Sequence, residues 1–228
     1  MRSPFLLLLL ALAISLVISW WSHPLREAVM GGDPARQLAT LATSDRDLAA
    51  ALAAADRGDA SPLVQWLNRA EPLERQQVGL LIVKSAAGNP PSDQKIYQQR
   101  HRLLPFVSVS TGNAEIDRTL DNALAYALVV GTASPVPEEV ALAKTLADRL
   151  AAPARDGRDH ALFDTIGCVR FVAGDAAAAK AAFTSAVEHA TAAHVEEHQL
   201  DLYRRRLAAS ERLATQPGER LPLEAPTP

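Results

Sequence analysis

Apolar side chains recur at helical spacing along most of this chain. Between residues 113 and 131, for example, Ile116, Leu120, Leu124 and Leu128 repeat every four positions. That spacing places all four on one face of an α-helix, which can then be buried against a neighbouring helix. Related patterns predict about ten helices, over residues 35–42, 45–57, 63–70, 73–87, 94–104, 114–130, 140–152, both halves of 161–190, and 195–214.

Residues that begin helices separate these segments. Asp33 followed by Pro34 is a favourable start, with Asp at the N-cap and Pro at the first helical position. Ser44 and Asn113 are predicted to cap later helices in the same way. Residues 106–112 alternate between apolar and polar, but no second convincing strand lies nearby. We therefore interpret them as an irregular connection and predict an all-α fold.

The most specific pattern lies between residues 161 and 190. It predicts two helices joined by a turn at Gly174 and Asp175. Small residues let two antiparallel helices approach closely, while large residues fill the space beside them. The residues concerned are Phe163, Ile166 and Gly167 in the first helix, and Ala179, Phe183 and Ala186 in the second.

This order of residues resembles the tetratricopeptide repeat, whose pattern is Trp-x2-Leu-Gly-x2-Tyr, then Ala-x3-Phe, then a closing Pro. Two positions depart from it: Arg170 stands where the family has a buried Tyr, and Thr191 where it has Pro. The alternative is an ordinary Ala-rich helical hairpin. The resemblance implies a right-handed stack of antiparallel helical hairpins, an α-solenoid like that of tetratricopeptide proteins.

The predicted repeat domain covers residues 33–214. A helix, a turn at Gly58 and Asp59, and another helix occur earlier in the chain as a less perfect copy of the same plan. About three repeats are needed to bury a continuous core, so the 161–190 unit is expected to be one member of a stack. The last helix, 194–214, has one apolar stripe and suits a cap at the open end.

The amino-terminal segment predicts a membrane anchor. Residues 5–21 form a run of seventeen residues without a charge, preceded by a short cytoplasmic segment, 1–4. As a helix the run would span about 26 Å, at the short end of what a bilayer core requires. The competing interpretation is a signal peptide cleaved after Ser19, but that would leave Trp20 and Trp21 at the new terminus. A Trp pair is typical of a membrane interface, which favours the uncleaved anchor.

The anchor determines the expected location of the rest of the chain. We expect a single-pass protein of the inner (cytoplasmic) membrane, with its main domain on the periplasmic side. Residues 22–32 contain a Pro and two Gly and are predicted to be a linker. Residues 215–228 contain four prolines and are predicted to be a disordered tail.

Composition supports helices and excludes some partners. Hydrophobic residues make up 48% of the chain but aromatic residues only 5%, so Ala and Leu supply the apolar surface. The net charge is −3, with no basic cluster beyond Arg204, Arg205 and Arg206, so nucleic acid is not an expected partner. A single cysteine, Cys168, excludes an internal disulfide and a multi-cysteine zinc site.

The one catalytic candidate is a possible zinc motif. His194, Glu197 and His198 fit the H-x-x-E-H pattern of inverted zinc peptidases, with Glu197 as general base. On a helical wheel, however, both histidines lie opposite the apolar stripe of Leu200 and Tyr203 and should face solvent. A catalytic zinc ion also needs a third protein ligand. The zinc-dependent hydrolase is therefore an alternative only, and we predict no enzyme, metal or cofactor.

Protein binding is the expected function. The resemblance to tetratricopeptide repeats implies that the first helix of each hairpin lines a concave groove for a peptide or partner helix. Its groove positions correspond here to Asp164, Cys168, Phe171 and Val172; the alternative is that these residues are buried between hairpins. The sequence thus predicts a membrane-anchored scaffold or adaptor for a protein or peptide partner, with no small-molecule substrate evident. A secreted or periplasmic structural protein, released by signal cleavage, is the alternative.

Overall fold

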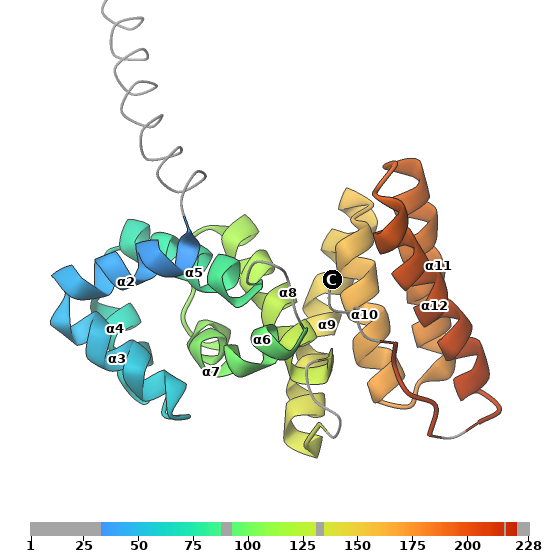
Figure 1. The fold of residues 1–228 in the computed structure, drawn as a ribbon, viewed down its shortest axis with the longest axis horizontal. Coiled ribbons are helices and arrows are strands. Elements are labelled where there is room, and N and C mark those ends of the chain that lie inside the picture. Colours follow the sequence, from blue (N-terminus) through green and yellow to red (C-terminus); the bar gives the residue numbers. More distant parts are fainter. Residues whose placement is uncertain (1–32, 88–92, 131–134, 217, 223–228) are drawn as a thin grey trace, which may run out of the picture.

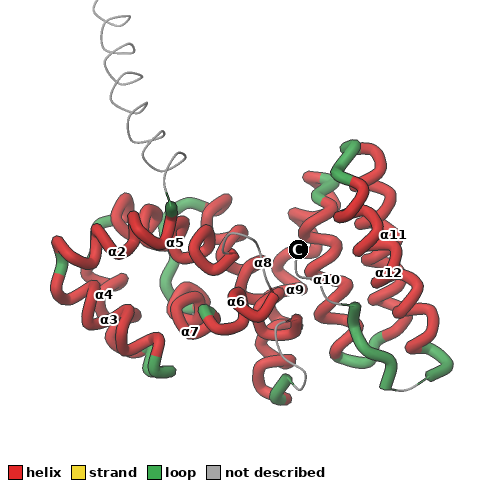
Figure 2. The backbone as a smooth tube through the Cα atoms, in the orientation of Figure 1, coloured by secondary structure: helices red, strands yellow, loops and turns green. Residues whose placement is uncertain are grey.

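The computed structural model describes residues 33–87, 93–130, 135–216 and 218–222. All regular secondary structure in these ranges is helical, as Figure 2 shows. The prediction of an all-α fold is confirmed for this part of the chain. The predicted cytoplasmic segment, membrane anchor and linker, residues 1–32, lie outside the described residues. None of the described helices combines the length and hydropathy needed to cross a bilayer.

Most helices of the amino-terminal half are short. The helices of this half are α2 (Pro34–Ser44), α3 (Arg46–Asp56), α4 (Ser61–Arg69), α5 (Pro72–Ala87), α6 (Asp93–Gln98), α7 (Arg100–Leu103) and the 3₁₀ helix η1 (Leu104–Val107), and α5 is the longest of them. The carboxyl-terminal half contains longer ones: α8 (Ala114–Val130), α9 (Pro137–Gly157), α10 (His160–Val172), α11 (Ala176–Ala192) and α12 (Glu197–Leu213).

Several pairs of consecutive helices pack side by side, and α2 also packs against α5. The pairs α3 and α4, α8 and α9, and α10 and α11 form hairpins, and α12 packs against α11 (Figure 1). In the second half α10 is central, because it contacts α8, α9, α11 and α12. One hydrophobic core runs from α2 to α12, and a smaller cluster of Ala186, Ala190, Leu200 and Tyr203 joins α11 to α12.

The helical hairpin predicted at residues 161–190 is present as α10 and α11. Gly174 occupies the turn with φ +78°, a conformation that favours glycine. Gly167 lies against the ring of Phe183, and a Cβ atom built on it would come within 2.5 Å of that ring. Ala179 and Ala186 are fully buried in the same contact region. The close approach of the two helices, predicted from their small residues, is confirmed.

Several helix boundaries differ from the predicted ones. Residues 94–104 do not form one helix, because α6 ends at Gln98 and α7 and η1 follow. Conversely, α9 continues past Pro153 to Gly157, beyond the polar break predicted from residue 155. Ala154 is fully buried on this extension, so tertiary packing outweighs the helix-breaking tendency of Pro153. Arg158, with φ +49°, ends the helix.

The predicted caps of α2 and α8 are confirmed, but that of α3 is displaced by one residue. Asp33 Oδ1 accepts from Ala35 N and Asn113 Oδ1 accepts from Glu115 N, both at 3.0 Å. The N-cap of α3 is Asp45. Ser44 is instead the last residue of α2, and its hydroxyl donates a hydrogen bond to the Leu41 carbonyl oxygen. An aspartate carboxylate can accept several backbone N–H groups at once, which a serine hydroxyl does less well.

Asp45 both caps α3 and binds the indole of Trp66 on α4, and its removal is expected to destabilise the protein. Its Oδ1 accepts from Asp47 N and Leu48 N, and its Oδ2 accepts from Trp66 Nε1 at 2.8 Å. We expect Asp45→Ala to lower the free energy of unfolding by about 0.5–2 kcal/mol, the usual effect of losing an N-cap. Urea unfolding of the full-length chain, followed by far-UV circular dichroism, measures this.

The comparison variant is Asp45→Asn, which keeps one oxygen for the cap but cannot also accept from Trp66 Nε1, so it should recover only part of the loss. The hydrogen bond from Leu48 N, followed by that from Trp66, lowers the pKa of Asp45 below its ordinary value of 3.8. A lowered pKa in the folded state means that this stabilisation is present above the ordinary pKa and disappears as the pH falls through the lowered one. An Asp45→Ala chain as stable as the wild type at neutral pH would contradict the assigned role.

Candidate functional site

A buried arginine joins the helices of the carboxyl-terminal half. Arg206 on α12 is fully buried, and its Nη1 forms an ion pair with Asp164 on α10, itself only 5% exposed. Its Nη2 donates to the hydroxyl of Tyr126 on α8 at 2.7 Å. Its Nε donates to the carbonyl oxygen of Pro222 at 3.1 Å. One guanidinium therefore connects α8, α10, α12 and the segment that follows α12.

We call the surface around Tyr126, Asp164 and Arg206 the α8–α10–α12 face. Desolvation alone would lower the pKa of the Arg206 guanidinium, but the neighbouring Cys168 and Asp164 groups raise it well above its ordinary value. Burial also raises the pKa of Tyr203, one turn earlier on α12. Arg206 is thus a fixed positive charge, and a neutral phenol lies beside it. The arrangement is suited to binding carbonyl and carboxylate oxygens rather than to proton transfer.

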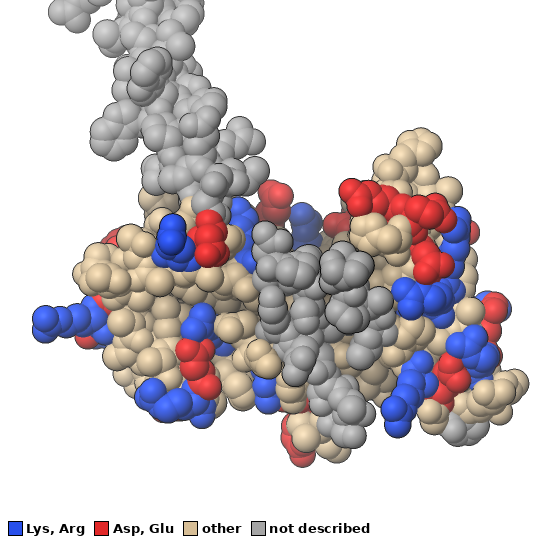
Figure 3. Space-filling view, in the orientation of Figure 1, with Lys and Arg blue, Asp and Glu red and all other residues tan. Residues whose placement is uncertain are grey.

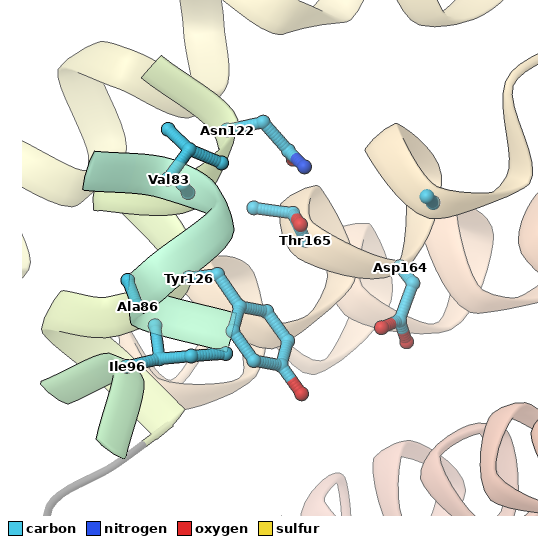
Figure 4. Close-up of a pocket in the computed structure, with 9 residues that line it drawn as sticks. Val83, Ala86, Ile96, Asn122, Tyr126, Asp164 and Thr165 are labelled. Carbon is cyan, nitrogen blue, oxygen red and sulfur yellow. The ribbon is translucent and has the colours of Figure 1, made fainter. Parts of the chain in front are cut away.

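A cavity of about 230 Å³ lies at the edge of this face, between α5, α6, α8 and α10. Figure 4 shows Val83, Ala86 and Ile96 along one side, with Thr165 and Asp164 across from them. The side formed by α5 and α6 is therefore apolar, and Asp164 and Thr165 of α10 place polar groups opposite it. The complete lining is Val83, Ala86, Ile96, Asn122, Ala123, Tyr126, Ala161, Asp164 and Thr165.

The segment after α12 reaches the same face. Glu219 accepts from Arg212 Nε and Nη2 at 3.0 and 2.7 Å, and Leu221 packs against the main hydrophobic core. Pro222 follows and binds Arg206. Residues 218–222 belong to the segment that the sequence predicts to be a disordered tail. They contain no regular secondary structure, but specific side chains hold them in place.

The four residues predicted for a groove lie mostly inside the protein. Cys168 is fully buried, and Phe171 is only 4% exposed. Val172 is partly buried and packs against the core. Asp164 lines the cavity but is occupied by its ion pair with Arg206. The burial of three of the four corresponds to the alternative interpretation, in which these positions pack between hairpins.

Arg206 itself was not predicted. It belongs to the run Arg204, Arg205 and Arg206, which stands out in the sequence only as a basic cluster. Arg204 and Arg205 do lie at the surface, where they pair with Glu197 and Asp201. Helical spacing could have indicated that Arg206 is buried. It follows the buried Tyr203 by three residues and therefore lies on the same side of α12.

The two histidines of the possible zinc motif do not share a helix face. His194 lies in the turn before α12 with φ +54°, whereas His198 lies within α12. Both are exposed, and His198 Nδ1 lies 3.2 Å from Glu196. In the described part of the chain no three His, Cys, Asp or Glu residues are grouped so that they could hold a metal ion. The paired helical geometry that the zinc alternative requires is absent.

A second hollow of about 410 Å³ lies among α9, α10 and α11. Phe163 and His189 stack beside it with ring centroids 5.3 Å apart, and Arg155 and Arg158 are exposed at its rim. On the molecular face shown in Figure 3, basic and acidic side chains are interspersed. This view shows no continuous basic surface of the kind that binds nucleic acid.

Comparison with family models, with characterised proteins and with solved structures gives no match for this chain. The resemblance to tetratricopeptide repeats therefore rests on the residue pattern of 161–190 alone.

Proposed function

We propose that this chain is a membrane-anchored helical-repeat scaffold or adaptor that binds a protein or peptide on the extracytoplasmic side. In this proposal α8 with α9 and α10 with α11 are consecutive repeats of a right-handed, tetratricopeptide-like stack, and α12 is its cap. The anchor is the uncharged segment 5–21. Cleavage of that segment would make the chain a released periplasmic protein with the same helical domain.

The observation that carries the proposal is the binding of an irregular segment to the α8–α10–α12 face. Arg206 holds the backbone carbonyl of Pro222 there, and Leu221 packs against the core. These helices are the first members of successive hairpins, plus the cap, which is where the resembling family lines its groove. A face that holds a non-helical segment through a hydrogen bond to its backbone and an apolar contact has chemistry of the kind used in peptide recognition.

The proposal predicts a crosslink from this face to another protein in native membranes. A photo-reactive amino acid at Asn122, whose side chain lines the cavity, should yield an adduct of higher mass with one defined partner. The measurement is immunoblotting and mass spectrometry of the adduct. The matched control is the same amino acid at Ala181, which is exposed on α11 beside the second hollow.

Two results would count against the proposal. One is an equal set of adducts from Asn122 and Ala181, which would show that the α8–α10–α12 face has no preferred partner. The other is the absence of any intermolecular adduct from Asn122. Carbonate washing of the same membranes tests the anchor, since a chain that keeps residues 1–21 should stay in the pellet. Recovery in the supernatant of a chain beginning near Trp20 would favour the released protein.

A further inference from the structure

The second hollow, among α9, α10 and α11, has a lining of one sign of charge. Arg155 and Arg158 belong to this lining, and no Asp or Glu does. Asp156 and Glu188 are neighbours of lining residues in the sequence, but neither lines the hollow. An anion that enters the hollow therefore meets two guanidinium groups and no carboxylate in its walls.

The two arginines of this hollow differ from other arginines on the same helices. Arg155 lies in the last turn of α9, Arg158 is the C-cap residue that follows it, and both are exposed. Several arginines of α9, α10 and α12 form ion pairs with acidic side chains, namely Arg149, Arg170, Arg204, Arg205 and Arg212. Within the part of the chain that the structure describes, no such pair forms at Arg155 or Arg158. Their guanidinium groups are available to an anion from outside the chain.

The deepest part of the second hollow is apolar. Ile166 and Ala182 line it and are each only 8% exposed. Phe163 is partly buried, and its ring stacks on that of His189 with an interplanar angle of 24°. An apolar group that covers these side chains leaves water and removes them from it, which is favourable. The hollow thus combines an apolar base with a cationic rim.

The size of the second hollow suits a small molecule. Its volume of about 410 Å³ falls within the usual range of small-molecule sites, about 300–1,000 Å³. A cavity of about 150 Å³ already accepts benzene. The hollow therefore has room for a body of one or two rings together with an anionic group.

We propose that the second hollow binds a small organic carboxylate with an apolar ring system. The rings lie against Phe163 and Ile166, and the carboxylate accepts hydrogen bonds from Arg155 and Arg158. A guanidinium group matches a carboxylate in shape and can donate two parallel hydrogen bonds to it. The linings of this hollow and of the 230 Å³ cavity share no residue, so the inference is independent of the proposed scaffold function.

Binding of 2-naphthoate to the full-length chain tests the proposal. Isothermal titration calorimetry measures it, with a titration into the same detergent buffer without protein as the blank. The neutral isostere 2-naphthamide has the same rings without the charge. We expect one saturable site that binds 2-naphthoate at least about tenfold more tightly than 2-naphthamide. Raising the salt concentration should weaken the binding of 2-naphthoate and leave that of 2-naphthamide unchanged.

Three variants locate the site. Arg155→Gln combined with Arg158→Gln should weaken 2-naphthoate binding at least about tenfold. The matched control, Arg204→Gln with Arg205→Gln, removes the same charge from paired arginines of α12 and should change the affinity by less than about twofold. Ala181→Trp, at an exposed position in the lining, should fill the hollow and abolish binding. Far-UV circular dichroism shows whether each variant is folded.

Four results would overturn the proposal. They are no saturable binding of 2-naphthoate to the folded chain, equal affinities for 2-naphthoate and 2-naphthamide, equal losses in the two double variants, and unchanged binding in folded Ala181→Trp. A peptide that ends in a free phenylalanine carboxylate, acetyl-Ala-Ala-Phe, distinguishes a free acid from a chain terminus. If it binds at least as tightly as 2-naphthoate, the hollow recognises the end of a peptide rather than a small molecule.

Discussion

Replacing Arg206 with Met should lower the free energy of unfolding by about 3–5 kcal/mol. The substitution removes the guanidinium but leaves the Asp164 carboxylate in the protein interior, where an uncompensated charge is strongly destabilising. It also removes the donors to Tyr126 and Pro222. Urea unfolding of the full-length chain, followed by far-UV circular dichroism, measures the loss.

Two further variants show whether the loss of stability comes from the buried ion pair or from removing any arginine of α12. Arg205→Met, on the same helix, breaks an exposed pair with Asp201 and should change stability by no more than about 1 kcal/mol. Adding Asp164→Leu to Arg206→Met should recover much of the lost stability, because apolar groups replace both buried charges. If Arg206→Met and Arg205→Met have equal effects, the buried ion pair does not stabilise the fold.

Gly167→Ala should destabilise the protein by about 1–3 kcal/mol, although alanine is the better helix former by about 1 kcal/mol. The new Cβ atom would lie 2.5 Å from Cδ1 of Phe183, a residue that is itself fully buried. The ring cannot move away without disturbing the packing of α10 against α11. The midpoint of urea unfolding, at an unchanged slope, reports the difference in stability.

The matched control is Gly157→Ala, because a Cβ built at that position meets no atom within 4 Å beyond its own chain neighbours and helix backbone. It should leave stability unchanged or raise it slightly. Phe183→Leu introduced together with Gly167→Ala should recover part of the loss, since the smaller side chain gives the methyl group room. Wild-type stability of Gly167→Ala would show that α10 and α11 are not in contact at this point.

Features that depend on neighbouring residues were predictable from the sequence. The caps at Asp33 and Asn113 and the turn at Gly174 follow from the chemistry of one or two side chains. The contact between Gly167 and Phe183 also follows from local spacing, because two helices joined by a short turn must pack against each other. The helical content and the hairpin of α10 and α11 could therefore be predicted.

Features that depend on distant residues could not be predicted. Arg206 is buried because Asp164, 42 residues earlier, and Tyr126, 80 residues earlier, meet it in space. Its spacing from Tyr203 places it on the inner side of α12, unlike the exposed Arg205, but no local pattern identifies the partners that make its burial favourable. The continuation of α9 past Pro153 is of the same kind, since the packing of Ala154 in the core determines it. The candidate site is built from such contacts, and of its residues the sequence pattern indicates only Asp164.

The link from Arg206 to Tyr126 also bears on how this protein unfolds. In a linear array of hairpins each unit touches only its neighbours, so a terminal helix is free to fray by itself. Here the side chain of the last helix reaches past α10 to α8, and its ion pair is shielded from water. Opening α12 alone would expose a charge pair and remove a hydrogen bond from α8 at the same moment. We therefore expect α8, α10 and α12 to unfold together rather than α12 alone.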